Sequence, residues 1–141
     1  MTKKNGTGVK PTESELELLD ILWEKGSATV REIYEALNER KASGYTTVLK
    51  LLQIMTSKGL VMRDEANRAH VYRASTDKPA MQSRLLEDLS TRLFSGSAAQ
   101  LALHALSMER VSAGELEAIR ALIERKRGSD TSAATPGKDR K

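Results

Sequence analysis

Residues 44–59 read GYTTVLKLLQIMTSKG, one amphipathic segment with a glycine at each end. Its apolar side chains recur at helical spacing and share one side, namely Val48, Leu51, Leu52 and Met55. Gly59 directly follows the pattern and is the residue type that most often ends a helix. The segment therefore predicts a helix over 44–58, buried on one face and open to contacts on the other.

Two shorter helices are predicted immediately before this segment. Thr12 with Glu15, and Thr29 with Glu32, have the spacing of a capping box, in which hydroxyl and carboxylate satisfy the first backbone amides. Apolar residues follow each cap at helical spacing, and Gly26 ends the first pattern. Three helices with brief breaks between them, all within 48 residues, indicate a tri-helical unit.

The helical period is lost after Gly59. Two extended stretches, 60–63 and 70–73, flank a charged segment and predict a β-hairpin. Residues 27–29 are a candidate third strand that would cover one edge of this hairpin. Three helices followed by a hairpin are the layout of a winged helix-turn-helix, which we place at residues 11–75. The predicted fold class is therefore mainly α with a small β-hairpin.

Residues 76–127 predict an α-helical dimerisation domain. Asp77 and Pro79 favour a helix start, residues 95–97 interrupt the pattern, and Ser112 with Glu115 forms a third capping box. The resulting helices have no sheet to cover, so we expect their apolar stripes to pack on a second copy of the chain. The alternative is that they fold back onto the winged helix of the same chain. The candidate dimerisation residues are Leu85, Leu89, Leu93, Phe94, Leu101, Leu106, Leu116, Ile119, Leu122 and Ile123.

Composition limits the class of protein and the compartment. The chain has no cysteine, and no apolar run approaches the roughly 20 residues of a membrane span. The N-terminal residues lack the apolar core of a signal peptide, which favours a cytoplasmic protein. Residues 1–10 are expected to form a disordered basic arm, and residues 128–141 a disordered tail. No metal site and no cofactor are predicted.

Charge is unevenly divided along the chain. Residues 11–40 have a net charge of −5, whereas residues 41–73 have +4 and residues 1–10 have +3. Such asymmetry points to a polyanion contacted by the middle segment, although a charge run can equally be a solvated face. The candidate DNA-binding residues are Tyr45, Thr46, Thr47, Lys50, Ser57 and Lys58 on the third helix, and Arg63, Asn67 and Arg68 on the hairpin.

Threonine hydroxyls and a lysine can read base edges or hold phosphates, and arginines on a wing can contact the backbone. Two alternatives stay open at this point. Thr46 and Thr47 could serve to cap the helix, and the hairpin tip could be a solvated turn.

The chain resembles the penicillinase-repressor family (BlaI/MecI/CopY). The resemblance covers about residues 11–126. It rests on ELELLDILW at 15–23, the Tyr-Thr-Thr-Val start at 45–48, the Lys-Gly-Leu-Val exit at 58–61, and Tyr72. It implies a homodimeric transcriptional repressor whose winged helices bind the two half-sites of a palindromic operator in double-stranded DNA.

The resemblance also implies a route of release. In the antibiotic-resistance members, a membrane-bound sensor metalloprotease directly or indirectly triggers cleavage within the dimerisation helices. The corresponding candidate cleavage region here is Ser97, Ala98, Ala99 and Gln100, which does not contain the Asn-Phe pair of those members. The cysteine cluster of the copper-responsive branch is absent as well.

The sequence also bears on three other functions. An enzyme is disfavoured because His70 and His104 lie far apart in the sequence, with no triad, phosphate loop or metal-ligand spacing near them. A winged helix used for protein–protein assembly would favour an apolar or acidic third helix, unlike Thr46, Thr47 and Lys50. A DNA-binding activator differs from a repressor only through the family resemblance.

Overall fold

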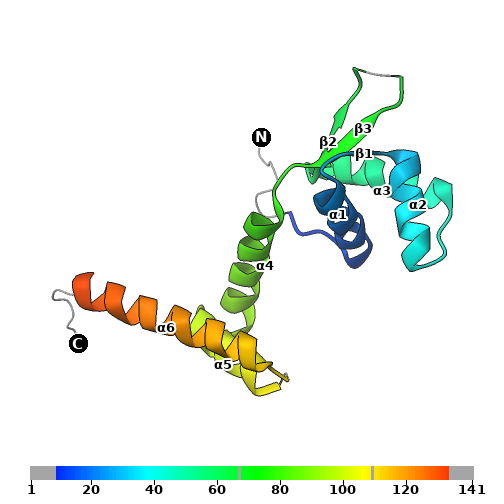
Figure 1. Ribbon diagram of the computed structural model, residues 1–141. Coiled ribbons are helices and arrows are strands. Elements are labelled where there is room, and N and C mark those ends of the chain that lie inside the picture. The colour runs from blue at the N-terminus through cyan, green and yellow to red at the C-terminus, as the bar shows by residue number, and fades with distance from the viewer. Residues whose placement is uncertain (1–8, 67, 109, 134–141) are drawn as a thin grey trace.

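The computed structural model describes residues 9–66, 68–108 and 110–133. Figure 1 shows a winged helix with a helical extension that leads away from it. The elements in chain order are α1 (Glu13–Lys25), β1 (Ala28–Thr29), α2 (Val30–Arg40), α3 (Tyr45–Lys58), β2 (Val61–Asp64), β3 (Val71–Ala74), α4 (Lys78–Leu93), α5 (Ala98–Met108) and α6 (Ala113–Ala133). The predicted fold class is confirmed.

The capping boxes form as the sequence predicts. The Thr12 hydroxyl accepts from the Glu15 amide at 3.2 Å, and the Glu15 carboxylate accepts from the Thr12 amide at 2.8 Å. The same reciprocal pair starts α2 at Thr29. Gly26 and Gly59 adopt positive φ after α1 and α3, a conformation that glycine reaches without the steric cost of a Cβ.

The sheet is three-stranded and antiparallel, in the order β1-β3-β2. Strand β3 lies in the middle, where Tyr72 is opposite Ala28 on one side and Arg63 on the other. The prediction that residues 27–29 cover one edge of the hairpin is confirmed. Tyr72 is 1% exposed and joins the core, so the wing is packed firmly against the helices.

The core lies between the three N-terminal helices and the sheet. Helix α3 contributes Val48, Leu52 and Met55, all fully buried, while Leu51 packs at the edge of the cluster. Helix α1 contributes Leu18, Leu19, Ile21 and Leu22, and α2 contributes Ile33 and Leu37. Fully burying such side chains contributes roughly 1.5–3 kcal/mol each, so the inner face of α3 is held firmly and its outer face is fixed in orientation.

The boundary expected at residue 76 does not separate two packing units. Met81, in the second turn of α4, is 2% exposed and belongs to the core, and Leu85 packs against the same cluster. Both lie one helical turn apart on the side of α4 that faces the winged helix. The first half of α4 is therefore part of the winged-helix unit.

The rest of the extension leaves its apolar side chains open. Leu93 and Met108 are each 68% exposed, and α5 buries no residue. In Figure 1, α5 and α6 lie well away from α1–α3, so the alternative of folding back onto the winged helix is not what the structure shows.

The ends of the chain differ in part from expectation. Helix α6 continues to Ala133, so it passes Gly128, where a disordered tail was expected to begin. Propagating an established helix adds one hydrogen bond per residue without a new nucleus, which offsets the roughly 1 kcal/mol cost of one glycine. Residues 134–141 and 1–8 lie outside the described residues. Val9 and Lys10 are described, and both contact α4.

One buried ion pair links the start of α1 to the end of α3. The Lys58 ammonium donates to the Glu15 carboxylate at 2.7 Å, and the Glu15 side chain is only 2% exposed. Burial raises the pKa of Glu15, but hydrogen bonds from Lys58 and from the Thr12 amide outweigh this, so its pKa lies below 4.5. The pair fixes the C-terminal end of α3 against the first turn of α1.

We expect Lys58→Met to lower the free energy of unfolding by about 1–3 kcal/mol, because it leaves a buried carboxylate without its cation. Chemical denaturation at a fixed protein concentration measures this. Lys41→Met is the control, since it removes the more exposed Lys41–Glu17 pair at 2.9 Å, and should cost less than about 1 kcal/mol.

The same pair predicts a pH dependence. Because the folded-state pKa of Glu15 is lowered, its contribution is complete above the unfolded value of about 4.5 and is lost as the pH falls through the folded value. The difference in stability between wild type and Lys58→Met should therefore shrink as the pH is lowered from 5 to 3. A difference that stays constant over this range would contradict the assignment.

Candidate nucleic-acid interface

The outer face of α3 is exposed and polar. Tyr45, Thr46, Thr47, Lys50 and Ser57 all face solvent, as the sequence predicts for the side opposite the core. Helix α3 contains no acidic residue, so nothing in the helix itself repels a phosphate. Ile54 is 44% exposed on the same helix and adds an apolar contact point.

The first turn of α3 carries unused donors. Its N-cap is Gly44, which makes no side-chain cap hydrogen bond. Neither Thr46 nor Thr47 makes a hydrogen bond through its hydroxyl within the part of the chain that the structure describes. The interpretation of these threonines as capping residues is therefore wrong here. Their hydroxyls, and the backbone amides at the positive end of the helix dipole, are available to an anionic partner.

Tyr45 is held in place by two residues of α2. Its ring lies edge-on to Tyr34 with centroids 5.4 Å apart, and the Arg31 guanidinium lies 5.7 Å from its centroid. Arg31 also pairs with Glu35 at 3.6 Å, but its side chain remains 67% exposed. The Tyr45 ring is thus oriented before any partner binds, and Arg31 brings a cation to the same end of α3.

The two arginines predicted to act on the wing, Arg63 and Arg68, differ in whether they form an ion pair within the described residues. Hydrogen bonds to the Tyr72 phenol and to the Glu65 carboxylate raise the pKa of Arg63, and Arg63 forms an ion pair with Glu65. Arg68 is exposed and has no ion pair among the residues that the structure describes. Asn67, predicted as a contact, lies outside the described residues. Of the predicted wing cations, Arg68 is therefore the readier one to meet a phosphate.

Lys58 does not share the outer face of α3. Its ammonium is paired with Glu15 and its side chain is 29% exposed, so it serves the junction between α1 and α3. We therefore leave it out of the interface. A lysine near a helix end gives no sequence signal for such a pairing, because its partner lies 43 residues away.

A groove between α3, the start of α2 and the wing brings in residues that the sequence did not suggest. It encloses about 460 Å³ and is lined by Thr29, Val30, Arg31, Tyr45, Leu49, Gln53, Arg63, Ala69, His70 and Tyr72. Arg31, Gln53 and His70 are additional candidates for contact. The helix-turn-helix layout could have pointed to Arg31, since it places the first turn of α2 beside α3. No sequence pattern indicated His70, which lines this groove because of the register in which β3 pairs with the neighbouring strands.

The predicted dimerisation residues fall into two groups. Leu85 packs on the winged-helix core, and Phe94, Leu101 and Ile119 are half-buried. The exposed ones are Leu89, Leu93, Leu106, Leu116, Leu122 and Ile123. A groove of about 360 Å³ lies between α4 and α5, where the rings of Phe94 and His104 are 5.9 Å apart.

The candidate cleavage region lies at the start of α5. The Ser97 hydroxyl accepts from the Gln100 amide at 3.1 Å, so Ser97 caps α5, and residues 98–100 form its first turn. Just before it, Ser95 and Gly96 both have positive φ, where the chain turns out of α4.

Two kinds of feature are absent from the described residues. No helix there is long and apolar enough to cross a membrane. Within the same residues, no group of three histidine, cysteine or acidic side chains is placed to hold a metal ion.

Known proteins with the same sequence pattern are transcriptional regulators. A family model described as penicillinase repressor matches residues 11–125. The transcriptional regulator BlaI of Mycobacterium tuberculosis is 34% identical over 107 residues, which cover 75% of this chain and 77% of that protein. The methicillin resistance regulatory protein MecI of Staphylococcus aureus is 22% identical over 115 residues, 82% of this chain and 94% of that protein. The chain therefore belongs to the penicillinase-repressor family, and it is a transcriptional repressor of the BlaI/MecI type rather than an enzyme.

Proposed function

We propose that the chain binds an inverted-repeat operator in double-stranded DNA as a homodimer, with one winged helix on each half-site. The observation that carries this proposal is the outer face of α3, which is polar, free of acidic residues and rigidly mounted. Helix α3 has 14 residues, which at roughly 1.5 Å each is long enough to lie in a major groove, and the wing lies beside it (Figure 1).

The contacts divide by chemistry. Thr46, Thr47 and Lys50 are the candidates for reading base edges, because hydroxyls donate and accept, threonine methyls contact thymine methyls, and lysine reaches guanine acceptors. Tyr45, Arg31 and the free amides of the first turn suit phosphates, as does Arg68 on the wing. Ser57, near the far end of α3, is suited to a flanking phosphate.

The exposed apolar residues support the dimer. Leu93, Leu116, Leu122 and Ile123 are each at least 45% exposed on helices that have no core of their own. A monomer that left these side chains in water would forgo roughly 25 cal/mol for each Å² of apolar surface. A second copy of the same helices would cover them with complementary surface, as a two-fold interface requires.

Dimerisation and DNA affinity are coupled. Once one winged helix is bound, the second binds as an intramolecular partner at a high effective concentration, so affinity far exceeds that of either half alone. Release follows from disrupting α4–α6. A membrane-bound sensor metalloprotease acting at residues 97–100 would have to unwind the first turn of α5, because a protease binds its substrate in an extended form.

Lys50→Ala and Arg68→Ala should each reduce the dependence of DNA binding on salt. Loss of one phosphate contact lowers the slope of log K against log [salt] by about 0.9, and each substitution removes one such contact per protomer, so the slope for the dimer should fall by about 1.8. Fluorescence anisotropy over a salt series, on a site selected from random DNA by the wild type, measures the slopes. Arg92→Ala is the control, since Arg92 is an exposed cation on α4. An unchanged slope for Arg68→Ala would remove Arg68 from the interface, and an unchanged slope for Lys50→Ala would leave Lys50 with a contact to base edges alone.

Leu116→Glu combined with Ile123→Glu should convert the dimer to a monomer, because it places charges where apolar surfaces meet. Sedimentation velocity measures the mass, and affinity for a two-half-site DNA should fall by at least tenfold. Emission from Trp23, the single tryptophan, reports whether the winged helix stays folded. A folded monomer that kept full affinity for the two-half-site DNA would contradict the proposal.

A further inference from the structure

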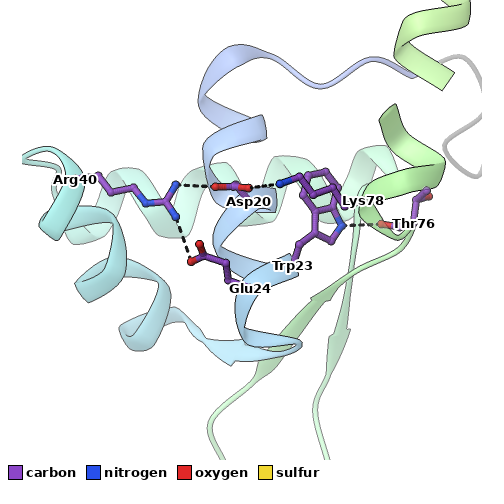
Figure 2. Close-up of polar contacts among 6 residues, drawn as sticks. All are labelled: Asp20, Trp23, Glu24, Arg40, Thr76 and Lys78. Atoms are coloured by element: carbon purple, nitrogen blue, oxygen red, sulfur yellow. Dashed lines mark hydrogen bonds and ion pairs between the residues drawn. The ribbon is translucent and has the colours of Figure 1, made fainter. Parts of the chain in front are cut away.

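The winged helix and α4 are joined by a set of directional polar contacts. Asp20 of α1 accepts from Arg40 of α2 at 3.1 Å and from Lys78, the first residue of α4, at 3.3 Å. Figure 2 shows Arg40 and Lys78 reaching the Asp20 carboxylate from opposite sides. Beside them, the Trp23 indole donates to the Thr76 carbonyl at 2.9 Å. We call these five residues the clasp.

A second set of contacts holds α4 farther along. Lys10 pairs with Asp88 at 3.3 Å, and Arg84 donates to the Val9 carbonyl at 3.3 Å. These residues line a cavity of about 420 Å³ between the segment before α1 and the middle of α4. Helix α4 is therefore fixed to the winged helix at its first turn by the clasp, and again about two turns later.

The clasp supplies orientation that the apolar contacts do not. Met81 and Leu85 bind α4 to the core, but apolar contact is non-directional, and methionine is flexible enough to follow a shifted helix. Hydrogen bonds of about 3 Å hold their partners to narrow ranges of distance and angle. Lys78 and Asp20 are 50% and 37% exposed, so their pair alone contributes little free energy. The orientation is held by this pair together with the partly buried Trp23–Thr76 hydrogen bond.

We propose that the clasp fixes the angle between α3 and the dimerisation helices, and so sets which spacing between operator half-sites the dimer accepts. This inference rests on the proposed dimer. Helix α4 is the only covalent route from the winged helix to α5 and α6. Any rotation at the first turn of α4 therefore moves α3 of one protomer relative to α3 of the other. One base pair of added spacing shifts a half-site by roughly 3.4 Å and 35° around the DNA axis, so a rigid clasp makes the dimer selective.

The test uses the full-length protein with Lys78→Met and Trp23→Phe combined. These changes keep an aromatic ring at position 23 and an unbranched chain at position 78 but remove both donors that reach across the junction. Lys41→Met is the matched control, because Lys41 forms a 2.9 Å pair with Glu17 that ties α2 to α1 and does not involve α4. None of these residues lies on the outer face of α3.

The first measurement needs no DNA. The chain has no cysteine, so Ser57→Cys gives a single site on α3 for a nitroxide label, and pulsed electron paramagnetic resonance reports the distance between the two labels of a dimer. We expect a narrow distribution for wild type and Lys41→Met, and a distribution at least twice as wide for the clasp variant. An equally narrow distribution in the clasp variant would overturn the inference. Absence of any dipolar signal in wild type would instead overturn the proposed dimer.

The second measurement uses the half-site selected from random DNA, placed as inverted repeats whose spacing changes in steps of one base pair. Wild type and Lys41→Met should prefer the best spacing at least tenfold over its neighbours. The clasp variant should distinguish them by less than threefold, with affinity for a single half-site unchanged. A clasp variant that kept the wild-type spacing profile would refute the role of the clasp. A wild type that bound two half-sites no better than one would refute the dimeric mode of binding.

Discussion

Burial of the inner face of α3 is the constraint on which the rest of the structure depends. Val48, Leu52 and Met55 are fully buried between α1, α2 and the sheet. Because a helix has a fixed period, fixing this stripe in the core fixes the opposite stripe in solvent. The exposed threonines and Lys50 are presented in one orientation without any interaction of their own. The Glu15–Lys58 pair then holds the far end of the helix to α1.

Charge along the chain is used for two different purposes. Some cations form ion pairs within the protein: Lys58, Arg40 and Lys41 pair with acidic residues of α1. Others, such as Lys50 and Arg68, stay exposed and are available to a polyanion. The acidic surplus of residues 11–40 therefore serves mainly to hold the winged helix together, and the basic surplus that follows is only partly available for binding.

Helix α4 belongs to two units at once. Its first half contributes Met81 to the core of the winged helix, while its second half exposes Leu89 and Leu93 on the extension. This continuity matters for regulation, because a disturbance of the exposed half is transmitted along the helix to the half that packs against the core of the winged helix. A flexible linker at residue 76 would have uncoupled the two, whereas the hydrogen bond from Trp23 to Thr76 prevents that.

The sequence by itself determined the elements and their order. Capping boxes at Thr12, Thr29 and Ser112, glycines after α1 and α3, and the change from helical to extended periodicity depend on neighbours within a few residues, so they can be read locally. The exposed face of α3 followed from the same period. Only the tertiary structure decided that Lys58 pairs with Glu15, that Arg31 lies over Tyr45, and that Met81 belongs to the winged helix. Each of these contacts joins two different elements, and those of Lys58 and Met81 span long stretches of the chain. Which residues meet across such a distance is set by how the elements pack, and no local sequence pattern encodes that packing.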